Sequence, residues 1–186
     1  MVSTNFATQL DHSLISAAKR GRSAAQRVIF ETYKTPVYRL IRGLTRDPEL
    51  AQDLSQDAFI QAFQKLPQLQ DHNALGSWLK QLSVNLTLAH LRKPQRLVAV
   101  DSAALEHEES PQPSQAAAER LSELDDLEKY LELLQPEEQQ IVWLYLVEDF
   151  NHNEIAELYQ IPAATIRQRY HRALKKLQQG VLKYVE

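Results

Sequence analysis

Cysteine is absent from this 186-residue sequence, and glycine is scarce, with only four residues. The lack of cysteine excludes disulfides and thiolate metal sites, and it is compatible with the reducing cytoplasm in which we expect the protein to reside. The few glycines form no phosphate-binding loop, and neither a GxSxG nor a GxxxxGK[ST] motif occurs. The six histidines form no HExxH pattern. We therefore expect no enzymatic activity, no metal and no cofactor.

Long apolar stretches are also missing. No run approaches the roughly 18–20 residues that a bilayer-spanning helix needs. The first residues lack the basic start and continuous apolar segment of a secretory signal. Alternating apolar and polar residues are too few to predict a strand, whereas apolar residues recur at helical spacing along most of the chain. We therefore expect an all-α protein without direct membrane insertion.

Charge is unevenly distributed, although the net charge is only −3. Residues 1–96 hold 13 Lys and Arg against 7 Asp and Glu, a net charge of +6. Residues 97–121 have one basic and five acidic residues, with two prolines and many small polar side chains, which is typical of a flexible acidic linker. Residues 122–186 are acidic overall, yet residues 163–176 carry five basic residues and no acidic one. Two basic regions, one on each side of the linker, are compatible with phosphate contacts.

An isoleucine among polar residues marks the first of two amphipathic helices expected in residues 50–94. At 100° per residue, one face of this helix is apolar. The opposite face gathers Asp53, Gln56, Asp57 and Ile60. This mixture suits a docking surface, but single exposed aliphatic residues are common, so the helix alone leaves both interpretations open.

The second helix, expected from Trp78 to Lys93 with Ser77 as its N-cap, carries a narrow polar ridge between two apolar groups. The ridge consists of Gln81, Asn85 and Arg92. Trp78 shares a face with leucines, so we favour core packing for its indole over stacking on a base.

A helix-turn-helix is predicted between the linker and the C-terminus. Asn151 and Glu154 have the spacing of a capping box at the start of a short helix. A turn ending at Pro162 leads to a second helix, which we expect Gly180 to terminate as a C-cap. This helix has one apolar and one basic face, and the preceding helix and turn favour DNA binding over a merely solvated face. The candidates for base or phosphate contacts are Thr165, Arg167, Gln168, His171, Arg172 and Lys175.

These motif blocks resemble a bacterial protein family. AQDLSQDAF is similar to the family's AEDLVQETF-like helix, WLKQLSVNLTLAHLRK to WL-x-x-I-A-x-N-x-x-x-D-x-x-R-K, and NEIAELYQIPAATIRQRYHRALKKL to its helix-turn-helix. The blocks and their order resemble the extracytoplasmic-function (ECF) sigma factors, sigma-70 family members that retain regions 2 and 4 and a linker. The resemblance implies a region 2-like helical bundle at 1–96 and a region 4-like helix-turn-helix domain at 122–186, joined by the linker at 97–121.

The resemblance also implies a transcription initiation factor that binds core RNA polymerase and promoter DNA. Polymerase docking would fall to Asp53, Gln56, Asp57 and Ile60. The −10 element would be held by Gln81, Asn85, Arg92, Lys93 and Arg96, and the basic helix of the helix-turn-helix would read the −35 element. Family members are commonly held by an anti-sigma factor, so such a partner is implied too, although no residue of this chain indicates it.

Some positions depart from the family pattern. Ala89 stands where the family usually has Asp, Gln160 replaces a turn glycine, and Ala164 and Gln168 replace a Gly and a Ser of the recognition helix. Two alternatives therefore stay open. One is a stand-alone helix-turn-helix regulator, which leaves the mixed face of the first helix unexplained. The other is a divergent sigma-like interaction protein that does not direct initiation.

Overall fold

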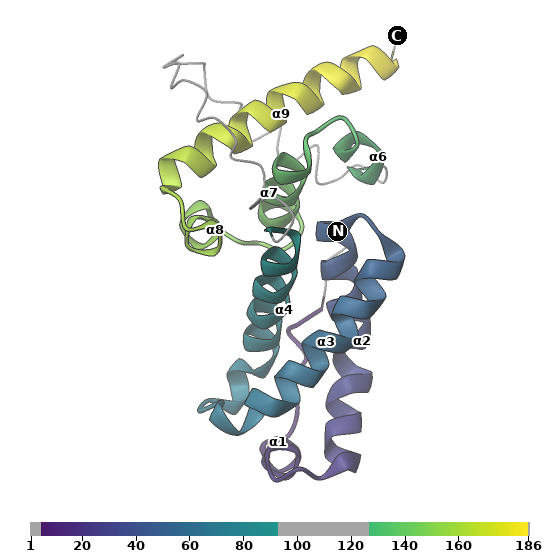
Figure 1. Cartoon of the computed structure of the whole chain (residues 1–186), viewed down its shortest axis with the longest axis vertical. Helices are drawn as coiled ribbons and strands as arrows, with labels where there is room; N and C mark the ends of the chain where they lie inside the picture. Colours follow the sequence, from purple (N-terminus) through teal and green to yellow (C-terminus); the bar gives the residue numbers. More distant parts are fainter. Residues whose placement is uncertain (1–4, 93–126, 186) are drawn as a thin grey trace. The chain divides into compact units, whose positions relative to one another are not determined.

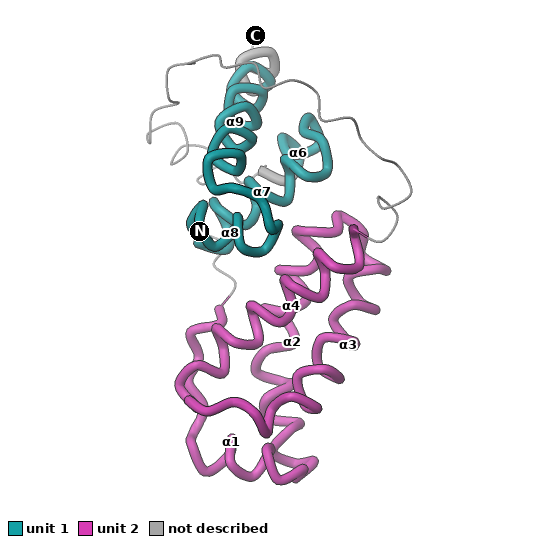
Figure 2. The backbone as a smooth tube through the Cα atoms, turned by 60° about the vertical axis from the view of Figure 1, so that its left-hand side comes forward, with its two compact units in different colours: residues 1–3, 97–186 teal, residues 4–96 magenta. Residues whose placement is uncertain are grey.

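A computed structural model describes residues 5–92 and 127–185. These residues form α-helices and short 3-10 turns without a strand (Figure 1), so the predicted all-α fold is confirmed for the described part of the chain. The chain divides into two compact units, one at residues 4–96 and one within residues 97–186 (Figure 2). The predicted linker at 97–121 lies outside the described residues. Among the helices that the structure describes, none is both long enough and apolar enough to cross a bilayer.

The N-terminal unit is built from α1 (His12–Lys19), α2 (Ser23–Thr45), α3 (Pro48–Lys65) and α4 (Leu75–Arg92). The central helix is α2, which packs against the other three. Burial of a large apolar side chain contributes about 1.5–3 kcal/mol, so the long buried face of α2 is a major part of this core. Its most deeply buried members, at helical spacing, are Ile29, Tyr33, Val37, Leu40 and Ile41.

Helix α4 begins at Leu75, three residues before the predicted start, so Ser77 is not its N-cap. A 3-10 turn at His72–Ala74 leads directly into the helix, and Asp71 caps that turn by accepting from the Asn73 N–H at 2.9 Å. Because the turn already sets the helical path, Ser77 lies inside α4, where its hydroxyl donates to the Ala74 carbonyl at 3.0 Å.

A close backbone contact joins the start of α4 to the N-terminal segment. A Cβ built on Gly76 would lie 2.0 Å from the carbonyl oxygen of Phe6. Phe6 is 9% exposed, and its ring stacks on that of Tyr33 with the centroids 6.3 Å apart. The Tyr33 hydroxyl donates to the Thr8 carbonyl. Gly76 is therefore required by space, since any side chain would force the backbone of Phe6 to shift.

The C-terminal unit contains α6 (Leu127–Leu131), α7 (Pro136–Leu146), α8 (His152–Tyr159) and α9 (Ala163–Val185). Helix α9 packs against the other three. The predicted apolar face of α9 is confirmed for five of its six members, which are at most 3% exposed: Ile166, Tyr170, Ala173, Leu174 and Leu177. The sixth member, Ala163 at the start of the helix, is half-buried.

The predicted capping box at the start of α8 is also confirmed. Asn151 Oδ1 accepts from the N–H groups of Asn153 and Glu154 at 2.9 and 3.1 Å, and Glu154 Oε2 accepts from the Asn151 N–H at 2.7 Å. At the other end, Gln160 adopts the left-handed conformation with φ of 57°. A glutamine there costs about 1–2 kcal/mol relative to glycine, so the departure from the family's turn glycine carries strain.

The prediction that Gly180 terminates the last helix is wrong, since α9 continues to Val185. A Cβ on Gly180 would lie 2.3 Å from Cδ1 of Leu133, in the segment between α6 and α7. The missing side chain of Gly180 therefore leaves room for the tip of the Leu133 side chain. A glycine in this tertiary role cannot be distinguished from a C-cap in the sequence.

Four rings from three helices meet at the junction of the helix-turn-helix. The centroid of Tyr145 lies 4.5 Å from those of His152 and Tyr170, and His171 follows at 5.8 Å from Tyr170. Burial lowers the pKa of both imidazoles, and the nearby charges of His171 and Arg167 lower the pKa of His152 further. Burial raises the pKa of the Tyr170 phenol. The fold therefore favours neutral rings in this cluster.

We expect Gly76→Ala to lower the free energy of unfolding of the N-terminal unit by about 1–3 kcal/mol, because the Phe6 backbone must move. Urea unfolding followed by circular dichroism measures the change. Gly180→Ala is the control: its added Cβ meets only the end of an exposed, flexible Leu133 side chain, and alanine is favoured inside a helix by about 1 kcal/mol. A Gly76→Ala protein as stable as the parent would contradict the close contact.

We expect the C-terminal unit to lose stability as the pH falls below about 6.5, the pKa of histidine in an unfolded chain. The folded state lowers the pKa of His152 and His171, so below that pH the unfolded state binds more protons. Thermal unfolding between pH 5 and 8 measures the dependence. His152→Phe keeps a ring beside Tyr145 but cannot titrate, so it should flatten the profile; an unchanged profile would contradict the assignment.

Candidate functional site

The four residues predicted for docking form one outward surface of α3. Ile60 is 55% exposed, the highest value among the large apolar side chains of the described residues. With so little of its side chain buried, Ile60 contributes little to the core of the described residues. We call this surface the docking face, and it consists of Asp53, Gln56, Asp57 and Ile60, all exposed.

Aromatic rings border the docking face on the side of α2. The rings of Phe59 and Phe63 have centroids 6.0 Å apart, and Phe30 of α2 approaches Phe59 at 4.8 Å in an edge-on arrangement. Phe30 remains 36% exposed, and Phe63 is half-buried one helical turn from Ile60. The apolar part of the surface is therefore larger than Ile60 alone, which the periodicity of α3 could not reveal because Phe30 comes from another helix.

A groove of about 500 Å³ runs between α3 and α4. On α3 it is lined by Asp57 and Lys65, among others, and on α4 by Gln81 and Asn85 of the predicted ridge. Asp57 thus belongs to both the docking face and the groove. Ala89 also lines the groove with its side chain exposed, so the family's aspartate at this position would have added a carboxylate there.

Trp78 lies in the wall of this groove and is half-buried, so the preference for core packing is not supported. The side of α4 that faces the core includes two small polar residues instead, Ser83 and Thr87, which are fully buried. Their burial costs little, because each hydroxyl donates to the backbone carbonyl four residues earlier at 2.8 Å. Hydrophobicity alone would not have predicted that these two residues are fully buried while the indole is only half-buried.

The residues predicted to contact the −10 element differ in how exposed they are. Gln81 and Asn85 are exposed one helical turn apart. Arg92 is half-buried, and its Nε donates to the Leu88 carbonyl at 3.1 Å, so part of its guanidinium is bound to its own helix. Lys93 and Arg96 lie outside the described residues.

In the C-terminal unit, the predicted basic face of α9 has a centre and two flanks. The centre, directly opposite the buried face, holds Thr165, Gln168, Arg172 and Lys175; Thr165 is half-buried and the other three are exposed. We call these four residues the exposed strip. On the flank toward α8, Arg167 is exposed, whereas His171 is half-buried in the ring cluster.

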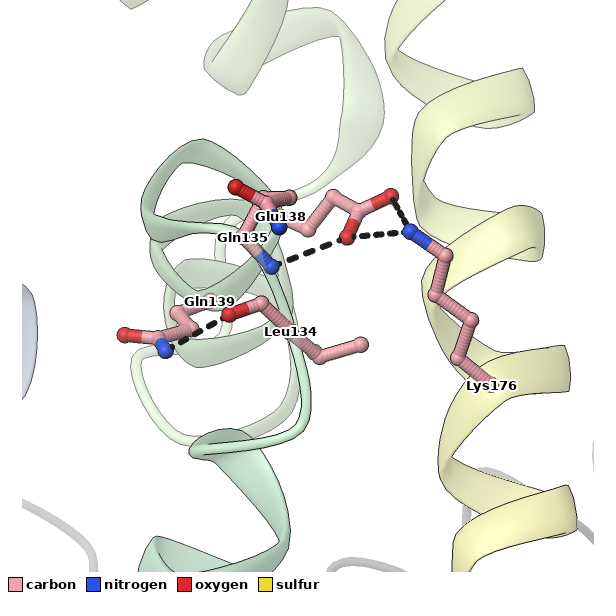
Figure 3. A network of polar contacts seen from close by, with 5 residues as sticks. All are labelled: Leu134, Gln135, Glu138, Gln139 and Lys176. Carbon is pink, nitrogen blue, oxygen red and sulfur yellow. Dashed lines mark hydrogen bonds and ion pairs between the residues drawn. The ribbon is translucent and has the colours of Figure 1, made fainter.

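The flank toward α7 is neutralised by two glutamates. Arg169 pairs with Glu137, and Lys176 places its Nζ 2.7 and 2.8 Å from the two carboxylate oxygens of Glu138. Figure 3 shows the second pair, with the Gln135 N–H donating to the same Glu138 carboxylate at 3.1 Å. These partners were not predicted from the sequence, although two glutamates in the first turn of a helix were a visible signal.

The described residues contain no group of three His, Asp or Glu side chains that could hold a metal ion. The geometry instead offers three surfaces. They are the docking face of α3, the polar groove between α3 and α4 with Trp78 in its wall, and the exposed strip of α9. These are the features of macromolecular recognition.

Comparisons with known proteins agree with this organisation. Residues 29–97 match the family model "Sigma-70 region 2", and residues 130–179 match "Sigma-70, region 4". The ECF RNA polymerase sigma factor SigW of Bacillus subtilis is 26% identical over 173 residues, covering 88% of this chain and 92% of that protein. The probable RNA polymerase sigma factor RfaY of Xanthomonas campestris is 30% identical over 169 residues, and this alignment covers 88% of this chain but only 42% of RfaY.

The fold has a solved counterpart. The sigma factor RpoE from Bartonella quintana, in complex with the anti-sigma factor NepR, matches with a TM-score of 0.54 and 22% identity, covering 82% of this chain and 94% of that one. Both regions of one family thus occur in the family's order, with an ECF factor aligned along nearly its whole length. The protein belongs to the sigma-70 family and is an RNA polymerase sigma factor of the ECF type.

Proposed function

We propose that this protein binds core RNA polymerase through the docking face of α3 and directs the enzyme to promoters with α4 and α9. The observation that carries the docking assignment is Ile60, 55% exposed between carboxylate and amide side chains in the region 2 unit. An exposed aliphatic group in a ring of polar residues is suited to the centre of a protein interface. Phe30 and Phe63 extend its apolar area.

For the −10 element, we assign the groove between α3 and α4. The carboxamides of Gln81 and Asn85 can donate to and accept from base edges, and such groups pair well with adenine. The half-buried indole of Trp78 offers a stacking surface for an unpaired base, which an opened promoter supplies. Arg92, with Lys93 and Arg96 that follow it in the chain, would contact phosphates.

For the −35 element, we assign the exposed strip of α9 together with Arg167 and His171. Arg172 and Gln168 stand at its centre, where a helix lying in a major groove meets base edges. A good bidentate contact to a base contributes about 1–3 kcal/mol of discrimination, so two or three such contacts suffice for a selective element.

The chain has no catalytic role of its own in this proposal, because RNA synthesis belongs to the polymerase. We place it in the cytoplasm with that enzyme. The anti-sigma factor seen with the Bartonella quintana protein suggests a partner of that class here, and the docking face is the surface where such a partner would compete with polymerase.

Reconstitution with core polymerase tests the proposal. We expect the full chain to bind core enzyme and to produce transcripts from a subset of fragments in a genomic library. Failure to bind core would support a stand-alone DNA-binding regulator. Binding without any transcript would support a sigma-like interaction protein, for which Ala89 in the groove is the physical argument.

In the same assay, Asp57→Arg should weaken core binding by at least tenfold, because it places a cation beside Ile60 in an apolar and acidic interface. The affinity for core polymerase is measured with a fluorescently labelled chain. Glu31→Arg is the control, since it makes the same charge change at an exposed position of α2 in the same unit. Equal losses in the two variants would indicate a general charge effect and remove the docking assignment.

Arg172→Ala should weaken binding of the holoenzyme to promoters selected by the parent protein, at equal core affinity. Loss of a base contact relaxes selectivity at one position of the upstream element, whereas loss of a phosphate contact lowers the slope of affinity against salt by about 0.9. Footprinting at several salt concentrations separates the two. Arg27→Ala, which removes an exposed arginine from α2, should leave both quantities unchanged. If only thermal stability changed in Arg172→Ala, α9 would be a solvated helix.

A further inference from the structure

The five cations in residues 163–176 are not equivalent in the structure. Arg167, Arg172 and Lys175 are exposed, and no described carboxylate is paired with them. Arg169 and Lys176 are instead bound to the glutamates in the first turn of α7. Two of the five charges are therefore already neutralised within the unit.

The two paired cations are close enough to the exposed strip to affect DNA binding. Arg169 precedes Arg172 by three residues and Lys176 follows it by four, so both are neighbours of Arg172 on the helix surface. The side chains of Arg169 and Lys176 are 31% and 48% exposed. Without the glutamates, both cations could reach the phosphates beside any base contact made by Arg172.

The geometry around Glu138 distinguishes its ion pair from an accidental surface contact. Glu138 holds the Lys176 ammonium with both oxygens, and one of those oxygens also accepts the Gln135 N–H that caps α7 (Figure 3). Because the bond to the Gln135 N–H already holds the Glu138 carboxylate in place, less side-chain entropy is lost when Lys176 pairs with it. Exposed ion pairs contribute little to stability, so stability alone gives little reason for two such pairs side by side.

We infer that Glu137 and Glu138 restrict nonspecific DNA binding by holding Arg169 and Lys176, so that phosphate contacts are limited and base contacts by the exposed strip decide the site. This inference rests on the proposed role of α9 in binding promoter DNA. Phosphate contacts strengthen binding to every sequence alike, whereas base contacts strengthen binding only to the correct one. A genome presents a vast excess of incorrect sites, so promoter selection depends on the ratio of specific to nonspecific affinity. Fewer phosphate contacts raise this ratio.

Glutamine substitutions test the inference with little structural disturbance. Glu137→Gln and Glu138→Gln remove the charge and keep the size, and a glutamine at position 138 can still complete the capping box. We expect the full-length variants to bind a random-sequence DNA duplex more tightly than the parent at low salt. The slope of log affinity against log salt should increase by about 0.9 for each released cation. Over a fourfold rise in salt, the double variant should lose roughly tenfold more affinity than the parent.

The matched control is Glu154→Gln. Glu154 occupies the same capping-box position in α8 and accepts from the Asn151 N–H, so the substitution makes the same charge change in the same unit. No cation of α9 is paired with it among the described residues. We expect this variant to keep the parental salt slope, even if a weaker field effect shifts its affinity. Unfolding curves establish that all variants are folded.

The outcomes separate this inference from the proposed function. An unchanged slope in the double variant, or a slope that rises equally in Glu154→Gln, would overturn the restriction by α7 while leaving the sigma assignment intact. Duplex binding that stays undetectable for the double variant at low salt would overturn it as well. Absence of core binding in the reconstitution assay concerns only the proposed function. With core polymerase, the double variant should initiate on more fragments of the genomic library than the parent.

Discussion

Burial of one side of each helix is the constraint on which both units depend. In α9, the burial of Ile166, Tyr170 and Leu174 fixes the rotation of the helix about its own axis. The opposite side must then face outward, and Arg172 stands at its centre. The surface that we propose for DNA recognition is in this sense a consequence of the core, because a helix turned by 100° would present a different set of side chains.

The same constraint acts on α3 in the N-terminal unit. Leu54, Ala58 and Phe59 are buried, so Ile60 cannot reach the core and remains in solvent beside Asp57. The exposure of an isoleucine is unfavourable for the isolated chain but useful when a partner covers it. One helix thus supplies a part of the core on one side and the proposed docking surface on the other.

In each unit, the local geometry determines which partners the polar side chains find. Ser83 and Thr87 are buried at low cost through bonds to their own helix. His152 and His171 pack at the tyrosine rings instead, and within the described residues each has a buried nitrogen without a hydrogen-bond partner. On α7, Glu138 satisfies a helix terminus and a lysine at once. The basic surface of α9 is thereby divided into a paired flank and an unpaired centre. In the proposed function, this division matters more for DNA binding than the number of basic residues does.

The sequence by itself determined the helices, the capping box of α8, the buried face of α9 and the composition of the docking face, because periodicity and caps are local properties. The distance between motif blocks and their resemblance to regions 2 and 4 were also visible in the sequence. Tertiary structure alone decided that Gly180 sits inside a helix, where Leu133 approaches it, and that Trp78 lines a groove. It also decided which cations of α9 are paired. These outcomes depend on side chains from distant parts of the sequence, up to 47 residues away in the case of Gly180 and Leu133. No local sequence pattern predicts such contacts.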